Sequence, residues 1–171
     1  MLVSKISFSS WLGFTLLGLI IGCASPKQKN PSPHANSEGP VDQLNMLAIP
    51  VALNFDQRPG PDGFVVKVYA GNRNRPRPVS ILSGTLELLM YDGILKSPGL
   101  NTAKPRRTWK YTSEELQAHV LKSSIGICYQ LAPQWGETKP LGEKISVVAH
   151  YTSPEGLSLY SAASVISVMA K

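Results

Sequence analysis

The sequence predicts an all-β protein: an antiparallel sandwich of six to seven strands with one short inserted helix near residues 113–122. Three observations support this fold class. Apolar and polar residues alternate over short runs, as they do in strands that bury one face. Clusters of Gly, Pro, Asp and Ser, which favour turns, separate these runs. Charged residues make up only 16% of the 171 residues, and Gly and Pro contribute 14 each, which excludes a coiled coil, a collagen and a wholly disordered chain.

Three strands are expected in the first half of the folded part. The first covers residues 47–55, where Pro50 places it at an edge or a bulge. A turn cluster at residues 59–63 follows. The next two strands cover residues 64–70 and 84–91. Each puts three apolar side chains on one face, Phe64, Val66 and Val68 in the earlier run and Leu86, Leu88 and Met90 in the later one.

Three further strands are expected in the second half, over residues 127–131, 144–151 and 157–169. The middle one is the most regular, because four apolar side chains share a face: Ile145, Val147, Ala149 and Tyr151. Residues 153–156 read Ser-Pro-Glu-Gly, with Pro at the second position and Gly at the fourth, as a tight turn favours. The last strand is rich in Ser, Val and Ala.

One segment breaks the two-residue period and predicts the helix. Thr112 followed three residues later by Glu115 forms the pattern of a capping box. On a helix over residues 113–122, three apolar residues would share one face: Leu116, Val120 and Leu121. We expect this helix to cover one end or one face of the sandwich.

The folded part as a whole, residues 46–171, resembles the immunoglobulin-like or transthyretin-like sandwiches in its strand pattern. The resemblance is one of pattern only. The sequence lacks the Cys…Trp…Cys spacing of antibody domains. We find no internal repeat.

The N-terminal residues 1–22 predict an export signal. Lys5 is the one charged residue before an uncharged apolar run over residues 11–21, which is too short to cross a bilayer comfortably and fits a secretory signal. The run ends in Ile20-Ile21-Gly22-Cys23, which resembles the lipobox of bacterial lipoproteins. The alternative is an uncleaved signal anchor with an incidental cysteine.

The lipobox resemblance implies that the signal is cut between Gly22 and Cys23, and that Cys23 becomes the lipidated first residue of the mature protein. The expected location is the cell envelope, anchored to a membrane. Ala24 after the cysteine resembles the default sorting signal for the outer membrane, facing the periplasm, if the organism is Gram-negative. Two or three acyl chains suffice for stable anchoring.

Residues 23–45 are expected to be the lipidated N-terminus and a disordered tether. Four prolines oppose helix and sheet, and almost nothing in the segment is apolar. As a flexible chain, the 22 residues after Cys23 would span roughly 25 Å. The predicted organisation is therefore a signal peptide, residues 1–22, a tether, residues 23–45, and a sandwich domain, residues 46–171.

Two arginine-rich segments are the candidate ligand-binding sites. One holds Arg73, Arg75 and Arg77, and the other holds Arg106, Arg107 and Trp109. Guanidinium groups bind phosphate or carboxylate in pairs of hydrogen bonds, and an indole offers a stacking face. Both segments are expected to be loops, and they could lie at the same end of the sandwich. The alternative is two solvated loops without a ligand.

Two weaker hypotheses concern aromatic residues and a thiol. Trp109, Trp135 and Tyr151 could form a flat platform for a carbohydrate, although such residues are more often part of a core or its rim. Cys128 could be a nucleophile if His119 or His150 acted as its base, and otherwise it is a small apolar strand residue.

These observations together predict a non-enzymatic, lipid-anchored envelope protein that presents a sandwich to an envelope protein or polymer. We expect no metal and no cofactor other than the covalent lipid, since the three histidines have no ligand spacing and no phosphate-loop or catalytic motif is present. No nucleic-acid partner is expected for an exported protein. An anionic-polymer or carbohydrate binding module is the alternative, and a thiol-dependent enzyme is a further one. The oligomeric state stays open.

Overall fold

A computed structural model describes residues 38–95 and 103–168. The predicted signal peptide, Gly22, Cys23 and most of the predicted tether lie outside these residues. The described part contains one short helix and nine strands: β1 (Gln43–Ala48), β2 (Val66–Gly71), β3 (Thr85–Asp92), β4 (Arg107–Thr112), α1 (Ser113–Gln117), β5 (Val120–Ser123), β6 (Gly126–Leu131), β7 (Lys144–Thr152), β8 (Ser158–Tyr160) and β9 (Ser164–Ser167).

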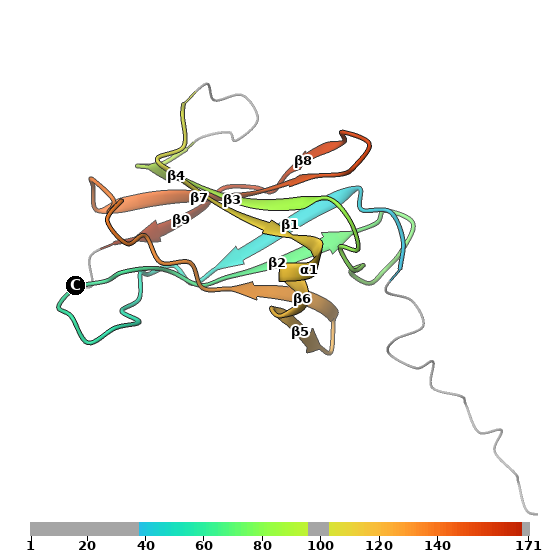
Figure 1. Cartoon of the computed structure of the whole chain (residues 1–171), viewed down its shortest axis with the longest axis horizontal. Helices are drawn as coiled ribbons and strands as arrows, with labels where there is room; N and C mark the ends of the chain where they lie inside the picture. Colours follow the sequence, from blue (N-terminus) through green and yellow to red (C-terminus); the bar gives the residue numbers. More distant parts are fainter. Residues whose placement is uncertain (1–37, 96–102, 169–171) are drawn as a thin grey trace, which may run out of the picture. The chain divides into compact units, whose positions relative to one another are not determined.

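The strands form two antiparallel sheets that face each other (Figure 1). The four-stranded sheet has the order β1-β2-β6-β5. The five-stranded sheet has the order β4-β3-β7-β8, and β9 pairs with the other half of β7. The predicted all-β antiparallel sandwich is therefore confirmed, with more strands among the described residues than the six to seven expected.

The core lies between the two sheets and contains the faces that alternation predicted. The apolar side chains expected to share a face in β3, in β7 and in β2 with the residues just before it are all buried: Phe64, Val66, Val68, Leu86, Leu88, Met90, Ile145, Val147, Ala149 and Tyr151. Burial of apolar surface on this scale is the main source of stability for a domain of this size.

The first strand begins earlier than predicted. Val41 and Leu44, which the sequence placed in the tether, are buried in the core, so the fold starts before Met46. The predicted strand at residues 47–55 leaves the four-stranded sheet after Ala48. Its backbone then bonds to the other sheet, because the N–H of Ala52 donates to the Ser167 carbonyl at 2.7 Å.

The predicted helix is confirmed at its start and wrong in its length. The Thr112 hydroxyl accepts from the Glu115 N–H at 3.2 Å, and the Glu115 carboxylate accepts from the Thr112 N–H at 2.8 Å. The helix ends at Gln117, where the N–H groups of Ala118 and His119 close its last turn on the Glu115 and Leu116 carbonyls, and the chain then pairs with β6. The His119 carbonyl accepts from the Gln130 N–H at 2.9 Å, and the residues from Val120 onward form β5.

Two further elements differ from expectation. The segment expected as a loop before the helix is largely the edge strand β4, in which Arg107, Trp109 and Tyr111 are half-buried and the alternate residues are exposed. The single last strand expected over residues 157–169 is divided into β8 and β9. Within the described residues, no helix is long and apolar enough to span a membrane.

Candidate functional site

The two arginine-rich segments lie at opposite ends of the sandwich. Arg73, Arg75 and Arg77 follow the end of β2. The other segment bonds to residues just after β6, whose last residue Leu131 pairs with Val66 at the start of β2. Six residues of strand, about 17 Å, separate these two ends. The two segments therefore do not combine into one positive field.

The segment at the far end is engaged within the protein. Arg107 donates to the Trp135 carbonyl, and its guanidinium lies 5.1 Å from the centre of the Trp109 ring. Arg106 lies 3.4 Å from the Asp92 carboxylate and donates to the Lys139 carbonyl at 2.9 Å. These contacts attach β4 and its leading residues to the loop after β6.

The segment at the near end is exposed. Its backbone is held by the Asp42 carboxylate, which accepts from the Arg73 N–H at 2.9 Å, and by the Asn72 carbonyl, which accepts from the Arg75 N–H at 2.9 Å. The side chains of Arg73, Arg75 and Arg77 all reach the surface. The Arg75 guanidinium lies alongside Gly39, so this loop borders the point where the described chain begins.

The aromatic platform considered for a carbohydrate is not formed. Trp135 and Tyr151 are buried in the core, and Trp109 packs edge-on against Phe64 with 5.4 Å between ring centres. The Trp109 Nε1–H donates to the Gln134 carbonyl at 3.1 Å. Trp109 and Trp135 both pack against Phe64, so these aromatic residues stabilise the fold.

Cys128 is fully buried on the outward face of β6. Burial raises the pKa of the neighbouring Tyr69 hydroxyl, and the adjacent Cys128 thiol raises that pKa further. His119 packs edge-on against Tyr111 at 5.8 Å, and His150 lies in the other sheet with polar partners of its own. A thiol with no exposed surface meets a substrate only if β6 opens.

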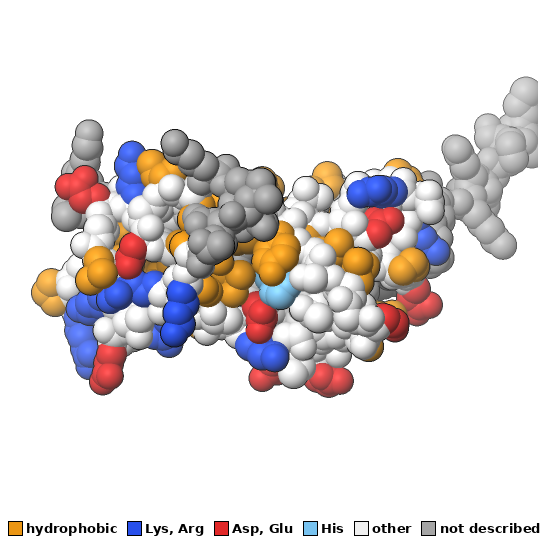
Figure 2. Space-filling model, turned by 90° about the horizontal axis from the view of Figure 1, so that it is seen from above, with side chains coloured by type: hydrophobic (Ala, Val, Ile, Leu, Met, Phe, Trp, Pro, Cys, Tyr) orange, Lys and Arg blue, Asp and Glu red, His pale blue; other side chains and the backbone are white. Residues whose placement is uncertain are grey.

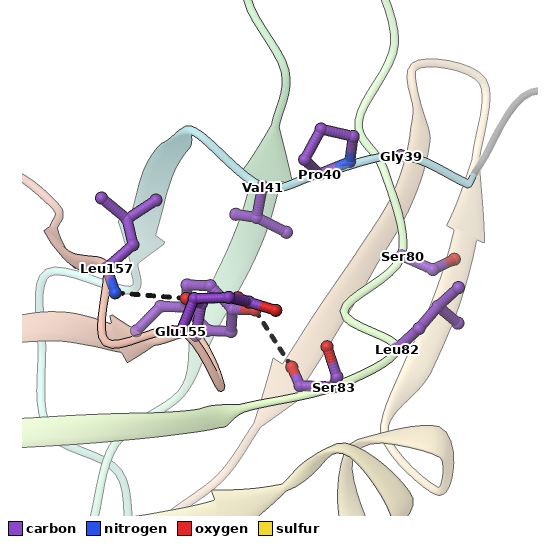
Figure 3. A pocket seen from close by; sticks show the side chains of 10 residues that line it. Gly39, Pro40, Val41, Ser80, Leu82, Ser83, Glu155 and Leu157 are labelled. Carbon is purple, nitrogen blue, oxygen red and sulfur yellow. Dashed lines mark hydrogen bonds between the residues drawn. The ribbon is translucent and has the colours of Figure 1, made fainter.

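A hollow of about 330 Å³ lies where the described chain begins (Figure 3). Its lining combines apolar side chains and hydroxyls: Gly39, Pro40, Val41, Ser80, Leu82, Ser83, Tyr151, Ser153, Glu155 and Leu157. The Tyr151 hydroxyl donates to the Ser83 carbonyl at 3.0 Å. The Ser153 hydroxyl and the backbone N–H of Glu155 lower the pKa of the Glu155 carboxyl, so this rim carries a negative charge at neutral pH.

A row of polar side chains, which we call the polar row, crosses the outer face of the five-stranded sheet. Register places Lys110 beside Glu87 and Glu87 beside His150. His150 Nδ1 lies 2.9 Å from the Glu87 carboxylate, and His150 Nε2 lies 2.7 Å from the Ser158 hydroxyl. Tyr160 stacks on the imidazole at 4.2 Å. Figure 2 shows acidic, basic, histidine and hydrophobic side chains gathered on this face.

Sequence reasoning missed the polar row. Glu87 and His150 occupy outward positions of strands that were predicted, so their exposure to one face could have been inferred. What joins them is the pairing of β3 with β7, two strands 63 residues apart at this point. No local pattern in the sequence encodes that pairing.

Among residues 38–95 and 103–168, no group of three or more His, Cys, Asp or Glu side chains could hold a metal ion. No family model, no curated protein and no solved structure matches the chain.

Proposed function

We propose that this protein is a lipid-anchored protein of the cell envelope, whose β-sandwich binds an envelope protein or polymer without catalysing a reaction. The observation that carries the proposal is the sequence Ile20-Ile21-Gly22-Cys23 after an uncharged apolar run. The sandwich that begins near Val41 supports it, since a folded domain follows the anchor after a short connecting segment.

The proposed anchor is a thioether-linked lipid on Cys23, and no other cofactor is needed. The proposed location is the outer membrane facing the periplasm in a Gram-negative organism. The binding partner is a protein or polymer of the envelope, since an exported sandwich with short strands and polar loops meets partners of that kind.

The test is metabolic labelling with a palmitate analogue. Cys23→Ser should abolish the label and leave a full-length precursor. Cys128→Ala is the matched control, because that thiol is buried in β6 and should not affect labelling. Label retained in Cys23→Ser would overturn the proposal.

The alternative, binding of an anionic polymer or carbohydrate, would use the near-end arginines. The side chains of Arg73, Arg75 and Arg77 are exposed at the surface, and Arg106, Arg107 and Trp109 make hydrogen bonds within the protein. Retention on heparin that falls steeply with salt, and falls again in Arg73→Ala/Arg77→Ala, would support this alternative. Passage of the protein through the heparin column at low salt would exclude this alternative.

A second candidate function, ester hydrolysis at Ser158, is favoured by one observation. The Ser158 hydroxyl, His150 and Glu87 follow the order of groups in a serine hydrolase triad. Ser158 Oγ would attack the ester carbonyl carbon, its proton would pass to His150 Nε2 and then to the departing alcohol, and water would release the acid. It ranks below the binding functions because the hollow of Figure 3 does not include Ser158.

A fluorophosphonate probe tests this second candidate. Labelling that is lost in Ser158→Ala and in His150→Gln would establish an activated serine. An unlabelled wild-type protein would exclude it.

A further inference from the structure

The end of the sandwich where the described chain begins carries exposed leucines. Leu82 is 59% exposed and Leu157 is 47% exposed. They come from different parts of the chain, the loop before β3 and the turn before β8, and lie on opposite sides of the hollow (Figure 3). We call this surface the tether end, defined by Gly39, Pro40, Leu82, Glu155 and Leu157. Leu82 and Leu157 therefore offer an apolar side chain on each side of the hollow.

The length of the preceding chain limits what can cover the tether end. Fourteen residues separate Cys23 from Glu38, and a flexible chain of that length would span about 21 Å on average. The opposite end lies one strand length away, about 23 Å along the eight residues of β3. On average, a lipid on Cys23 therefore holds the bilayer closer to the tether end, where the chain enters the sandwich, than to the opposite end.

Charged side chains of both signs lie at the tether end. The basic ones include Arg73, Arg75, Arg77 and Lys122, and the acidic ones include Glu38, Asp42, Glu114, Glu115 and Glu155. A mixed set of charges suits zwitterionic headgroups better than a polyanion. The attraction to the surface would then come from the leucine side chains, with little dependence on salt.

We infer that the tether end rests on the phospholipid bilayer, with Leu82 and Leu157 at the boundary between headgroups and acyl chains. This inference rests on the proposed lipid anchor. It gives the anchored domain a fixed orientation, in which the polar row stands on the side of the sandwich and the far-end segment with Arg106 and Arg107 points away from the membrane.

The experiment places one fluorescent label on the full-length lipidated protein in phosphatidylcholine vesicles with brominated acyl chains. Leu82→Cys supplies the reporter, since Cys23 would be blocked by its lipid and Cys128 is buried. Leu157→Cys is a second reporter at the same end. Leu141→Cys is the matched control, because Leu141 is 76% exposed and its N–H bonds to Asp92 at the opposite end.

The expected result is a blue shift and loss of most emission for labels at positions 82 and 157, unchanged by salt, with no loss at position 141. Equal quenching at all three positions, or quenching at none in protein that floats with the vesicles, would overturn the orientation and leave the anchor standing. Failure of the protein to float would overturn the anchor itself. Quenching removed by salt would indicate charge-driven binding and would also contradict the inference.

Discussion

The hydroxyl of Tyr129 accepts a hydrogen bond from the backbone N–H of Ile81 at 2.7 Å, inside the core. The two residues are 48 positions apart, and the bond ties β6 of one sheet to the loop that leads into β3 of the other. That loop continues through Leu82 and Ser83, which line the hollow at the tether end. A buried contact in the core therefore fixes the position of a proposed membrane-contact residue.

Removing the Tyr129 hydroxyl should destabilise the protein. Tyr129→Phe leaves the buried N–H of Ile81 without a partner, so the free energy of unfolding should fall by about 1–3 kcal/mol. Urea unfolding measures the change. Tyr160→Phe is the control, because Tyr160 is 46% exposed and keeps its ring stacked on His150, and it should change the value by no more than about 0.5 kcal/mol. Equal effects of the two would contradict the importance of the bond.

Stability should also fall at high pH. Burial raises the pKa of Tyr129 and of Tyr151 above the ordinary value of 10.0, although the N–H of Ile81 lowers the pKa of Tyr129 in part and a hydrogen bond with the Ser83 side chain lowers that of Tyr151 in part. The unfolded chain therefore loses these protons first as the pH rises. The contribution of these two hydroxyls to the free energy of unfolding is fully present below about pH 10 and declines above it. Urea midpoints from pH 8 upward measure the decline, and Tyr129→Phe should flatten it. A rise in stability over this range would contradict the sign.

The polar row should stabilise the edge of the five-stranded sheet. His150→Ala removes contacts with the Glu87 carboxylate, the Ser158 hydroxyl and the Tyr160 ring, and should cost about 1–3 kcal/mol in urea unfolding. Lys110→Ala is the matched control, because its side chain is 66% exposed and lies 3.9 Å from the same carboxylate. That variant should lose under about 1 kcal/mol. Comparable losses would mean that the row has no special role.

The arginines of the two ends should differ in their effect on folding. Arg107→Ala removes the bond to the Trp135 carbonyl and the contact with Trp109, so unfolding should become about 1–2 kcal/mol easier. Arg73→Ala keeps the backbone bond to Asp42 and removes an exposed side chain, so its effect should stay within about 0.5 kcal/mol. Thermal and urea unfolding of the pair measure the difference. A larger loss of stability in Arg73→Ala than in Arg107→Ala would contradict the conclusion that the far-end segment, and not the near-end one, supports the fold.

Local sequence patterns predicted the elements in which apolar residues follow a regular period and in which the ends are set by nearby residues. β3 and β7 were predicted well because alternating apolar residues mark the face of each strand that lines the core. The start of α1 was predicted because capping is a local interaction of Thr112 with Glu115. Its end was not, because the bond between Gln130 and His119 comes from a strand further along the chain.

The candidate site depended on more than local pattern. In β4, polar Arg107 takes a half-buried position beside Trp109, so alternation of apolar residues did not reveal the strand. The two arginine-rich segments lie at opposite ends of the sandwich because β6 pairs antiparallel with β2. The polar row depends on the register between β3 and β7. Strand pairing is a property of the assembled sandwich, and single residues do not encode it.

The proposed anchor, location and orientation all depend on the covalent state of Cys23. The direct measurement is mass spectrometry of the N-terminal tryptic peptide from the mature, membrane-extracted protein. We predict a peptide that begins at Cys23, ends at Lys27 and carries a diacylglyceryl thioether. A peptide that begins upstream of Cys23, or one in which Cys23 is unmodified, would contradict the anchor, the location and the orientation that follow from it.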